Sequence, residues 1–216
     1  MLEKMDKFFE VRLDGYEEHM LTNIESAAEF YPFTADCLPD TPRASILDLG
    51  CGTGLELNWY FRRNPTAKVT GIDLSEGMLV ALREKFPDRD LSLICGSYFD
   101  IPFGESAFDA AVSAESLHHF KQDEKISLYA RLCGALKPGG YFILTDYFSA
   151  SDEEEQAFFG ELARLKAVQG ITDDAFYHFD TPLTVQHETA ALLEAGFSSV
   201  EVLNSWGPTY TIKVTR

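Results

Sequence analysis

The chain has 216 residues, a length that suits one α/β domain with a sizeable core. Its 18 Lys and Arg against 35 Asp and Glu give a formal net charge of −17, which disfavours nucleic acid as a partner. A hydrophobic content of 45% excludes a disordered chain. Met1 to Gly15 does not resemble a signal peptide, and no apolar run approaches the roughly 20 residues of a membrane helix. We therefore expect a soluble, cytoplasmic protein.

The spacing of the four cysteines is also consistent with a cytoplasmic protein. None of the four has the C-x-x-C or metal-ligand spacing to another, so we expect reduced thiols rather than disulfides or a metal centre. They are Cys37, Cys51, Cys95 and Cys133.

In chain order, residues 1–38 have a mostly helical pattern, and the turn P-D-T-P at 39–42 separates them from the rest. Strand and helix then alternate, which predicts a parallel sheet with helices on both faces. The expected helices cover 55–64, 76–86 and 121–136, and the expected strands cover 69–73, 91–95, 108–114 and 141–146. Strands at 199–203 and 210–214 predict an antiparallel ending. These patterns give a doubly wound sheet.

The stretch 45–58 reads S-I-L-D-L-G-C-G-T-G-L-E-L-N, which predicts a buried strand, a glycine turn and the start of a helix. Glycines allow close approach and the helix start offers unpaired N–H groups, so the stretch predicts a cradle for a nucleotide-like ligand. A dinucleotide motif would place a third glycine where the chain has Leu55. Asp48, two residues before Gly50, favours a cationic ligand over a pyrophosphate.

A second acid supports this interpretation. Asp73 ends the next expected strand, 23 residues after Gly50, where a doubly wound fold places a carboxylate that accepts both ribose hydroxyls. Ser75 follows as an N-cap, and Glu76 lies in the first helical turn. The alternative is that either acid only caps a turn.

The motif D-L-G-C-G-T-G at 48–54 resembles the first motif of class I S-adenosylmethionine (SAM)-dependent methyltransferases. The resemblance implies a Rossmann-like, seven-stranded, mostly parallel sheet with an antiparallel last strand and an N-terminal helical cap. It also implies a single domain with a cap at 1–42, a cofactor-binding core at 43–147, a substrate-lid insertion and helix at 148–198, and a final strand pair at 199–216. The cofactor would be SAM and its product S-adenosylhomocysteine.

The resemblance also implies which residues hold the cofactor. Tyr16 loosely matches a tyrosine that closes over the methionine part, although packing of the cap is an equal alternative. G-S-Y-F-D-I-P-F at 96–103 resembles the adenine loop, but Ser97 stands where the family has an acid, so the adenine contact comes from Ser97, the Tyr98 backbone or Asp100. The cofactor candidates are Tyr16, Asp48, Gly50, Cys51, Gly52, Asp73, Leu74, Met78, Gly96, Ser97, Tyr98 and Ala114.

The stretch A-V-S-A-E-S-L-H-H-F at 111–120 is expected to face the transferred methyl. It lacks the N-P-P-Y of base-methylating enzymes and has one glutamate where protein-arginine methyltransferases have two, whereas S-L-H-H-F resembles small-molecule methyltransferases. We predict that His119, with His118 and Glu115 as further candidates, removes a proton from the acceptor. The alternative is that the histidines cap the loop. The ligands are too few to predict a metal site.

The long connection between Tyr147 and Ser199 is expected to supply the acceptor pocket. Within it, Ser151 and Thr184 are predicted helix N-caps, and the second helix is expected to end at Gly196. The aromatic run 176–179 predicts a lid over an apolar or aromatic acceptor.

The sequence therefore predicts methyl transfer from SAM to an O, N or S atom of a small molecule, by a monomer or homodimer. Three alternatives remain open. A non-catalytic SAM-binding or scaffold module would bind SAM and turn over no acceptor, and an NAD-dependent oxidoreductase would bind NAD instead. A tRNA-modifying enzyme of the same fold is disfavoured by the charge of −17.

Overall fold

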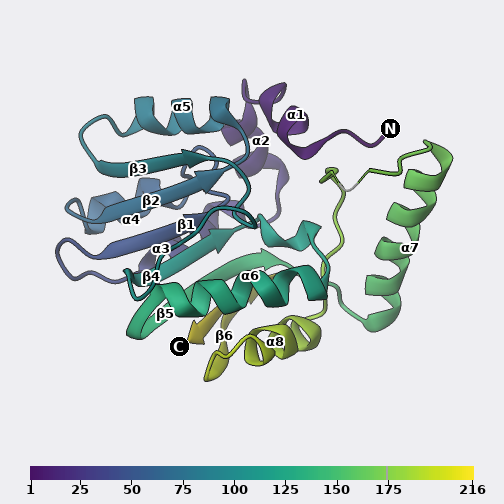
Figure 1. Cartoon of the computed structure of the whole chain (residues 1–216). Helices are drawn as coiled ribbons and strands as arrows, with labels where there is room; N and C mark the ends of the chain where they lie inside the picture. Colours follow the sequence, from purple (N-terminus) through teal and green to yellow (C-terminus); the bar gives the residue numbers. More distant parts are fainter. Residues whose placement is uncertain (174) are drawn as a thin grey trace.

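The computed structural model describes residues 1–173 and 175–216, which form one seven-stranded sheet of order β3-β2-β1-β4-β5-β7-β6 (Figure 1). Asp174, in the predicted lid connection, lies outside the described residues. The strands are β1 (Ser45–Leu49), β2 (Lys68–Asp73), β3 (Asp90–Cys95), β4 (Phe108–Ala114), β5 (Leu136–Tyr147), β6 (Ser199–Trp206) and β7 (Thr209–Thr215). β7 runs antiparallel to both of its neighbours, β5 and β6, and the other adjacent strand pairs are parallel, so the predicted fold class is confirmed. The strand order reverses between β1 and β4, which is where such sheets bind ligands.

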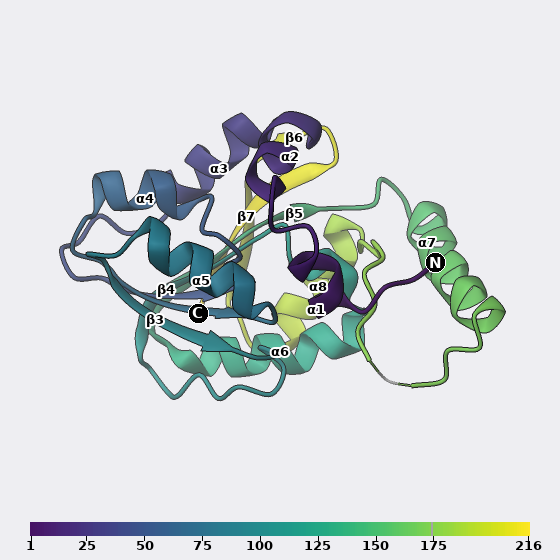
Figure 2. The same ribbon diagram turned by 90° about the horizontal axis from the view of Figure 1, so that it is seen from above.

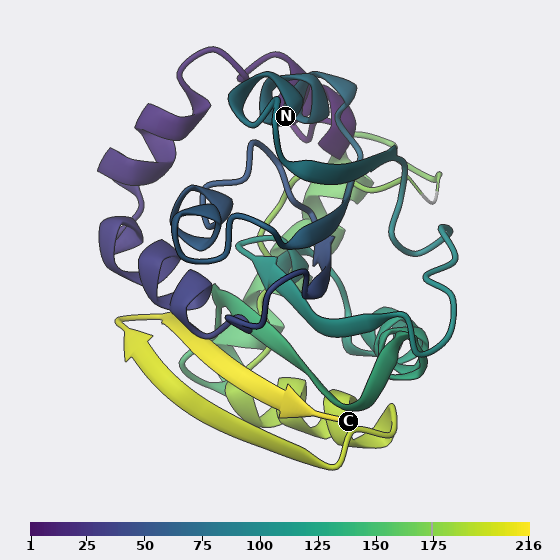
Figure 3. The same cartoon turned by 90° about the vertical axis from the view of Figure 1, so that its left-hand side faces the viewer.

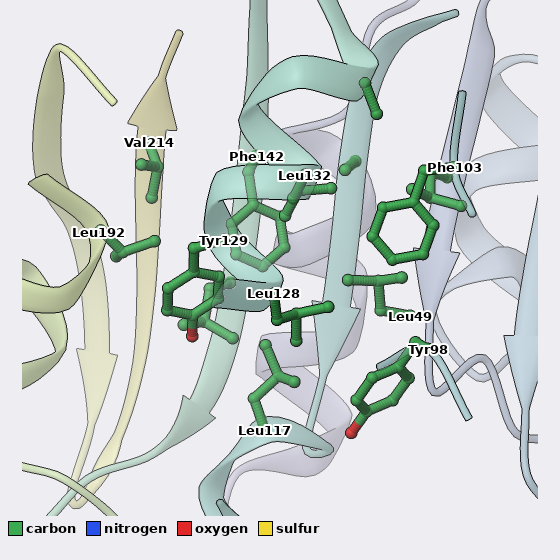
Figure 4. Close-up of a cluster of buried hydrophobic side chains, with 14 of the residues drawn as sticks. Leu49, Tyr98, Phe103, Leu117, Leu128, Tyr129, Leu132, Phe142, Leu192 and Val214 are labelled. Atoms are coloured by element: carbon green, nitrogen blue, oxygen red, sulfur yellow. The ribbon is translucent and has the colours of Figure 1, made fainter. Parts of the chain in front are cut away.

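Helices cover both faces of the sheet, and the two C-terminal strands form one edge (Figure 3). On one face, α3 (Ala27–Asp36), α4 (Leu57–Arg63) and α5 (Glu76–Lys85) bury their apolar side chains. On the other face, α6 (Gln122–Ala135) and α8 (Val185–Glu194) pack Leu128, Leu132 and Leu192 against Phe142 of β5 (Figure 4). The predicted alternation of strands and helices therefore gives one apolar layer on each face of the sheet. These two layers hold the strands, and with them the strand ends, in place.

The N-terminal segment lies against the carboxyl ends of the strands. It contains α1 (Met5–Glu10) and α2 (Tyr16–Asn23), and its first residues, which we call the N-terminal arm (2–9), contact the later connection. Met5 N donates to Phe176 O at 3.0 Å, and His178 N donates to Glu3 O at 3.0 Å. Two segments far apart in sequence therefore close over the same edge of the sheet.

Helix α7 (Asp152–Val168) stands apart from the sheet, beside the N-terminus (Figures 1 and 2). Ser151 caps it, as predicted, by accepting a hydrogen bond from Glu154 N at 3.3 Å. Buried Glu155 joins it to α8 by accepting from Thr184 N at 2.6 Å and contacting His187 Nδ1 at 2.9 Å. Within the described ranges, no helix has both the length and the apolar composition needed to cross a membrane.

Several predicted boundaries differ from the observed ones, and three of the differences have a clear structural reason. The helix expected from residue 55 begins at Leu57, because the glycine turn extends through residue 56. The strand expected at 141–146 begins at Leu136, since Phe108 pairs with Leu136 and Ala110 pairs with Tyr141 across an irregular K-P-G-G segment. The strand expected at 199–203 continues to Trp206, because antiparallel pairing with β7 persists up to the turn at 207–208.

Candidate active site

Two adjoining cavities open at the carboxyl ends of β1, β2 and β4. The inner cavity, of about 50 Å³, is lined by Met5, Phe9, Tyr16, Gly50, Gly52, Asp73, Leu74, Met78, Tyr98, Ala114, Glu115, Ser116 and His119. The outer cavity, of about 790 Å³, shares Phe9, Tyr16, Glu115 and His119 with it. The structure therefore brings most of the sequence-predicted cofactor residues to one place and connects them with two predicted catalytic residues.

The glycine loop approaches the end of β4 closely. Gly50 has φ +72°, and a Cβ there would lie 2.0 Å from Ser116 Oγ, so a side chain at this position clashes as well as straining the backbone. Cys51 turns its buried side chain into the sheet, toward Gly71, and does not line the cavity. Only the backbone of Cys51 can therefore take part in the predicted cofactor binding.

Asp73 organises the loop on which a ribose would rest. Its Oδ2 accepts from Gly52 N at 2.9 Å, and its Oδ1 accepts from Ser75 N at 2.8 Å. Burial raises the pKa of this carboxyl, while the backbone N–H donors lower it. A carboxylate has about four acceptor sites, so two backbone bonds leave acceptor capacity toward the cavity.

Asp48 lies beneath the loop and does not line the inner cavity. It is 1% exposed and adjoins buried Glu56, and burial followed by this neighbouring acid raises the pKa of Asp48 well above its usual range. Among the described residues, Asp48 Oδ2, Thr53 Oγ1 and Glu56 Oε1 are buried without a hydrogen-bond partner. Sequence reasoning missed Glu56; its signal was an acid two residues after Gly54, in the last position of the glycine turn.

The predicted adenine loop forms a tight turn, with Ser97 Oγ accepting from Phe99 N at 3.1 Å. Gly96 and Ser97 do not line the inner cavity, whereas Leu74 and Tyr98 do. The Tyr98 hydroxyl lies 3.2 Å from Ser116 Oγ and so joins this loop to the end of β4. Contact of Ser97 with adenine stays a prediction.

His118 is held between two acids. Its Nδ1 contacts Asp146 Oδ1 at the end of β5, and its Nε2 lies 3.5 Å from Asp180 Oδ1. Burial lowers the pKa of His118, but Asp146 and then Asp180 outweigh burial and raise it well above its usual range. The two acids therefore favour the imidazolium form of His118.

The pKa of His119 is shifted in the opposite direction to that of His118. Its Nδ1 lies 3.2 Å from Phe179 O and 3.4 Å from Asp180 Oδ1, and both of these atoms accept, so Nδ1 carries the hydrogen and Nε2 keeps a lone pair. Burial and the charge of His118 lower the pKa of His119 well below its usual range. Both effects favour the neutral form of His119. This residue lines both cavities, whereas His118 lines only the outer one.

Glu115 sits where the two cavities meet. Its φ of +52° turns the chain sharply after β4, and its Oε1 accepts from Thr209 Oγ1 at 3.4 Å. Burial and then the charge of Asp146 raise the pKa of Glu115 to about 8. Donor atoms of His118, His119 and Asp180 lie within 4.8 Å of one another, so the expectation that no metal binds stays a prediction.

The predicted lid is assembled differently from the expectation. Of residues 176–179 only His178 lines the outer cavity, where it stacks on Phe8 with ring centroids 3.5 Å apart. Phe176 instead packs on Phe99 and Phe120 in the core. The aromatic walls come largely from the N-terminal segment, which sequence reasoning had assigned to the cofactor end alone.

Sequence reasoning also missed Asp146 and Asp180. Asp146 has a recognisable signal, because it ends a buried strand next to the strand that carries Glu115. Asp180 has none in the sequence, since it reaches the histidines only through the fold of the connection.

The fold and this cleft at the switch point define a doubly wound, cofactor-binding domain. Residues 46–140 match the model of a family described as "Methyltransferase domain". A malonyl-[acyl-carrier protein] O-methyltransferase of Herminiimonas arsenicoxydans is 29% identical over 167 residues, which cover 77% of this chain and 57% of that protein. 24-methylenesterol C-methyltransferase 2 of Arabidopsis thaliana is 29% identical over 145 residues, covering 63% of this chain and 39% of that protein.

Among solved structures, human N-acetylserotonin methyltransferase in complex with SAM superposes with a TM-score of 0.66 at 17% identity, over 96% of this chain and 57% of that chain. With these likenesses the chain is similar to the class I SAM-dependent methyltransferases, and the cofactor of this class is SAM. It spans 39% and 57% of the lengths of the two curated relatives.

Proposed function

We propose that this protein transfers the methyl group of SAM to an O, N or S atom of a small-molecule acceptor. The observation that carries the proposal is that the inner and outer cavities meet at Glu115 and His119. A cofactor bound across the inner cavity and the adjoining part of the outer one would then present its methyl group toward an acceptor in the rest of the outer cavity. One curated relative, named an O-methyltransferase, supports an oxygen acceptor, whereas the sterol relative is named for transfer to carbon.

In this proposal the strand ends hold the cofactor. Asp73 accepts the ribose hydroxyls, and Gly50 and Gly52 let the backbone approach the methionine part. Asp48 lies buried beneath the loop, where the positive charge of a bound sulfonium or ammonium group would favour its ionised form. Further contacts come from Tyr16, Leu74, Met78, Gly96, Ser97, Tyr98 and Ala114 and from the backbone of Cys51.

His119 is the proposed general base. The lone pair on its Nε2 takes a proton from the acceptor, the acceptor attacks the methyl carbon in line, and the carbon–sulfur bond breaks to release S-adenosylhomocysteine. His118 and Glu115 keep their proposed place in the catalytic set. Burial and then the charge of His118 favour the neutral form of His119, and Glu115 marks the boundary between cofactor and acceptor.

Radiolabelled SAM and a panel of aryl-alkyl amines, phenols, thiols and carboxylic acids test this function. For the best acceptor, His119→Asn is expected to lower kcat about 10²- to 10⁴-fold, because positioned proton transfer contributes that much, while the Kd for SAM stays unchanged. His187→Asn, which replaces a histidine of α8 outside both cavities, is the control. SAM binding without turnover of any acceptor would favour the scaffold module instead.

A further inference from the structure

The charges around the outer cavity restrict the chemistry of the acceptor. This inference rests on the proposed function and concerns the same site. The cavity is lined by aromatic side chains and by acidic and basic residues. The acids are Asp14, Glu25, Glu115 and Asp180, and the bases are Arg12, His19, His118, His119 and His178. What an acceptor meets depends on which of these charges are already neutralised by a partner.

Arg12 and His118, the two cationic side chains that line the outer cavity, already contact acidic partners. Arg12 donates to both carboxylate oxygens of Glu3, at 2.8 and 3.2 Å, and its guanidinium lies 3.8 Å from the centre of the Phe8 ring. His118 lies between Asp146 and Asp180. A carboxylate entering the cavity would have to displace one of these acids from its cation.

The acidic side chains of the lining have fewer oppositely charged partners than the cationic ones. Asp14 and Glu25 form no ion pair with any residue in 1–173 or 175–216, and Asp180 shares one imidazolium with buried Asp146. The protein as a whole carries −17, so charge outside the cavity adds to the same field. Negative potential in a concave site concentrates cations and repels anions.

The walls fit the same kind of ligand. Phe8, Phe9, Tyr16 and Tyr147 line the outer cavity, and His178 stacks on Phe8. Aromatic faces attract cations through the negative charge above the ring, and they also cover an apolar body. A volume of about 790 Å³ lies within the range of pockets for small organic ligands.

We infer that the acceptor is an amine attached to an apolar or aromatic body, which enters as a cation. Its ammonium group is drawn to Asp180, next to His119. There it gives one proton to His119 Nε2, and the amine lone pair then attacks the methyl carbon of SAM. The carbon–sulfur bond breaks, S-adenosylhomocysteine leaves, the methylated ammonium is formed, and His119 releases its proton to water.

Three matched probes that differ only in the terminal group test this inference: 2-phenylethylamine, 2-phenylethanol and 3-phenylpropionate. Each is titrated into protein saturated with S-adenosylhomocysteine, and methyl transfer from radiolabelled SAM is measured in parallel. We expect the amine to bind at least tenfold more tightly than the carboxylate and more tightly than the alcohol. The advantage over the carboxylate is expected to shrink in 1 M NaCl.

Two variants locate the effect. Asp180→Asn is expected to reduce the preference for the amine several-fold, whereas Asp88→Asn, which removes the same charge at an exposed position between α5 and β3, is expected to leave it unchanged. Equal or tighter binding of the carboxylate or the alcohol would overturn the inference. Failure to bind S-adenosylhomocysteine would instead contradict the proposed function, so the two failures are distinguishable.

Discussion

At the scale of single residues, the cofactor loop depends on the absence of one side chain. Gly50 and Gly104 both have positive φ, +72° and +79°, but a Cβ at Gly50 meets Ser116 Oγ at 2.0 Å while a Cβ at Gly104 meets nothing within 4 Å. Both replacements by Ala should therefore cost about 1–2 kcal/mol of backbone strain. Only Gly50→Ala should also displace the loop.

Calorimetric titration with SAM separates the two effects. We expect Gly50→Ala to weaken SAM binding more than tenfold and Gly104→Ala to leave it unchanged. Adding Ser116→Gly to Gly50→Ala should restore part of the affinity, because it removes the obstructing hydroxyl. Equal affinities for the two single variants would show that the contact with Ser116 does not position the loop.

The second residue-scale prediction concerns Glu115. Burial and then Asp146 raise its pKa to about 8, above the roughly 4.3 of an unfolded glutamate, so the folded protein holds a proton that the unfolded chain releases. Stability should therefore fall as pH rises from about 4.5 to 8, by up to about 1.4 kcal/mol per pH unit. Glu115→Gln, which carries no titratable proton, should remove this decline.

Urea unfolding at pH 5, 6.5 and 8 measures the difference. The variant should gain stability relative to wild type as pH rises, and Glu105→Gln, at an exposed position, should follow wild type. A constant difference between wild type and Glu115→Gln across this range would show that Glu115 ionises normally in the fold.

At the scale of elements, α6 and α8 are joined through a buried ion pair. Lys125 Nζ lies 2.6 Å from Glu188 Oε2, the Tyr129 hydroxyl also donates to Glu188, and the side chains of the pair are 2% and 1% exposed. Removing one partner leaves a buried charge uncompensated, which typically costs about 3–5 kcal/mol. Lys125→Met should therefore destabilise the protein by about that much in urea unfolding.

The double variant Lys125→Met, Glu188→Gln is the informative comparison. It removes both charges and keeps a side chain that can accept from Tyr129, so it should recover most of the lost stability. If the double variant were as unstable as the single one, packing rather than charge would dominate this contact.

Elements with local signals could be predicted from the sequence. Ser75, Ser151 and Thr184 cap their helices as expected, because capping depends on neighbouring residues. The start of β5 was placed too late, since the irregular pairing with Phe108 depends on another strand. The pairing of the N-terminal arm with 176–178 left no sequence pattern at all.

At the scale of the molecule, the site joins segments that are distant in sequence. The cofactor side could be predicted, because Gly50 and Asp73 follow consecutive strands whose ends share one edge of a parallel sheet. The acceptor side could not, because Asp146 and Asp180 reach the histidines through β5 and the long connection. The arm that supplies Phe8 and Phe9 closes the cavities over both.

Calorimetric titration of SAM, S-adenosylhomocysteine and NAD into wild type and Asp73→Ala tests the central claim most directly. We expect SAM and its product to bind wild type, and NAD not to bind. The variant should bind SAM about 1–3 kcal/mol more weakly, since Asp73 is the proposed acceptor of the ribose hydroxyls and also accepts from Gly52 N and Ser75 N. Binding of NAD in place of SAM, or equal SAM affinity in the variant, would contradict the account of this site.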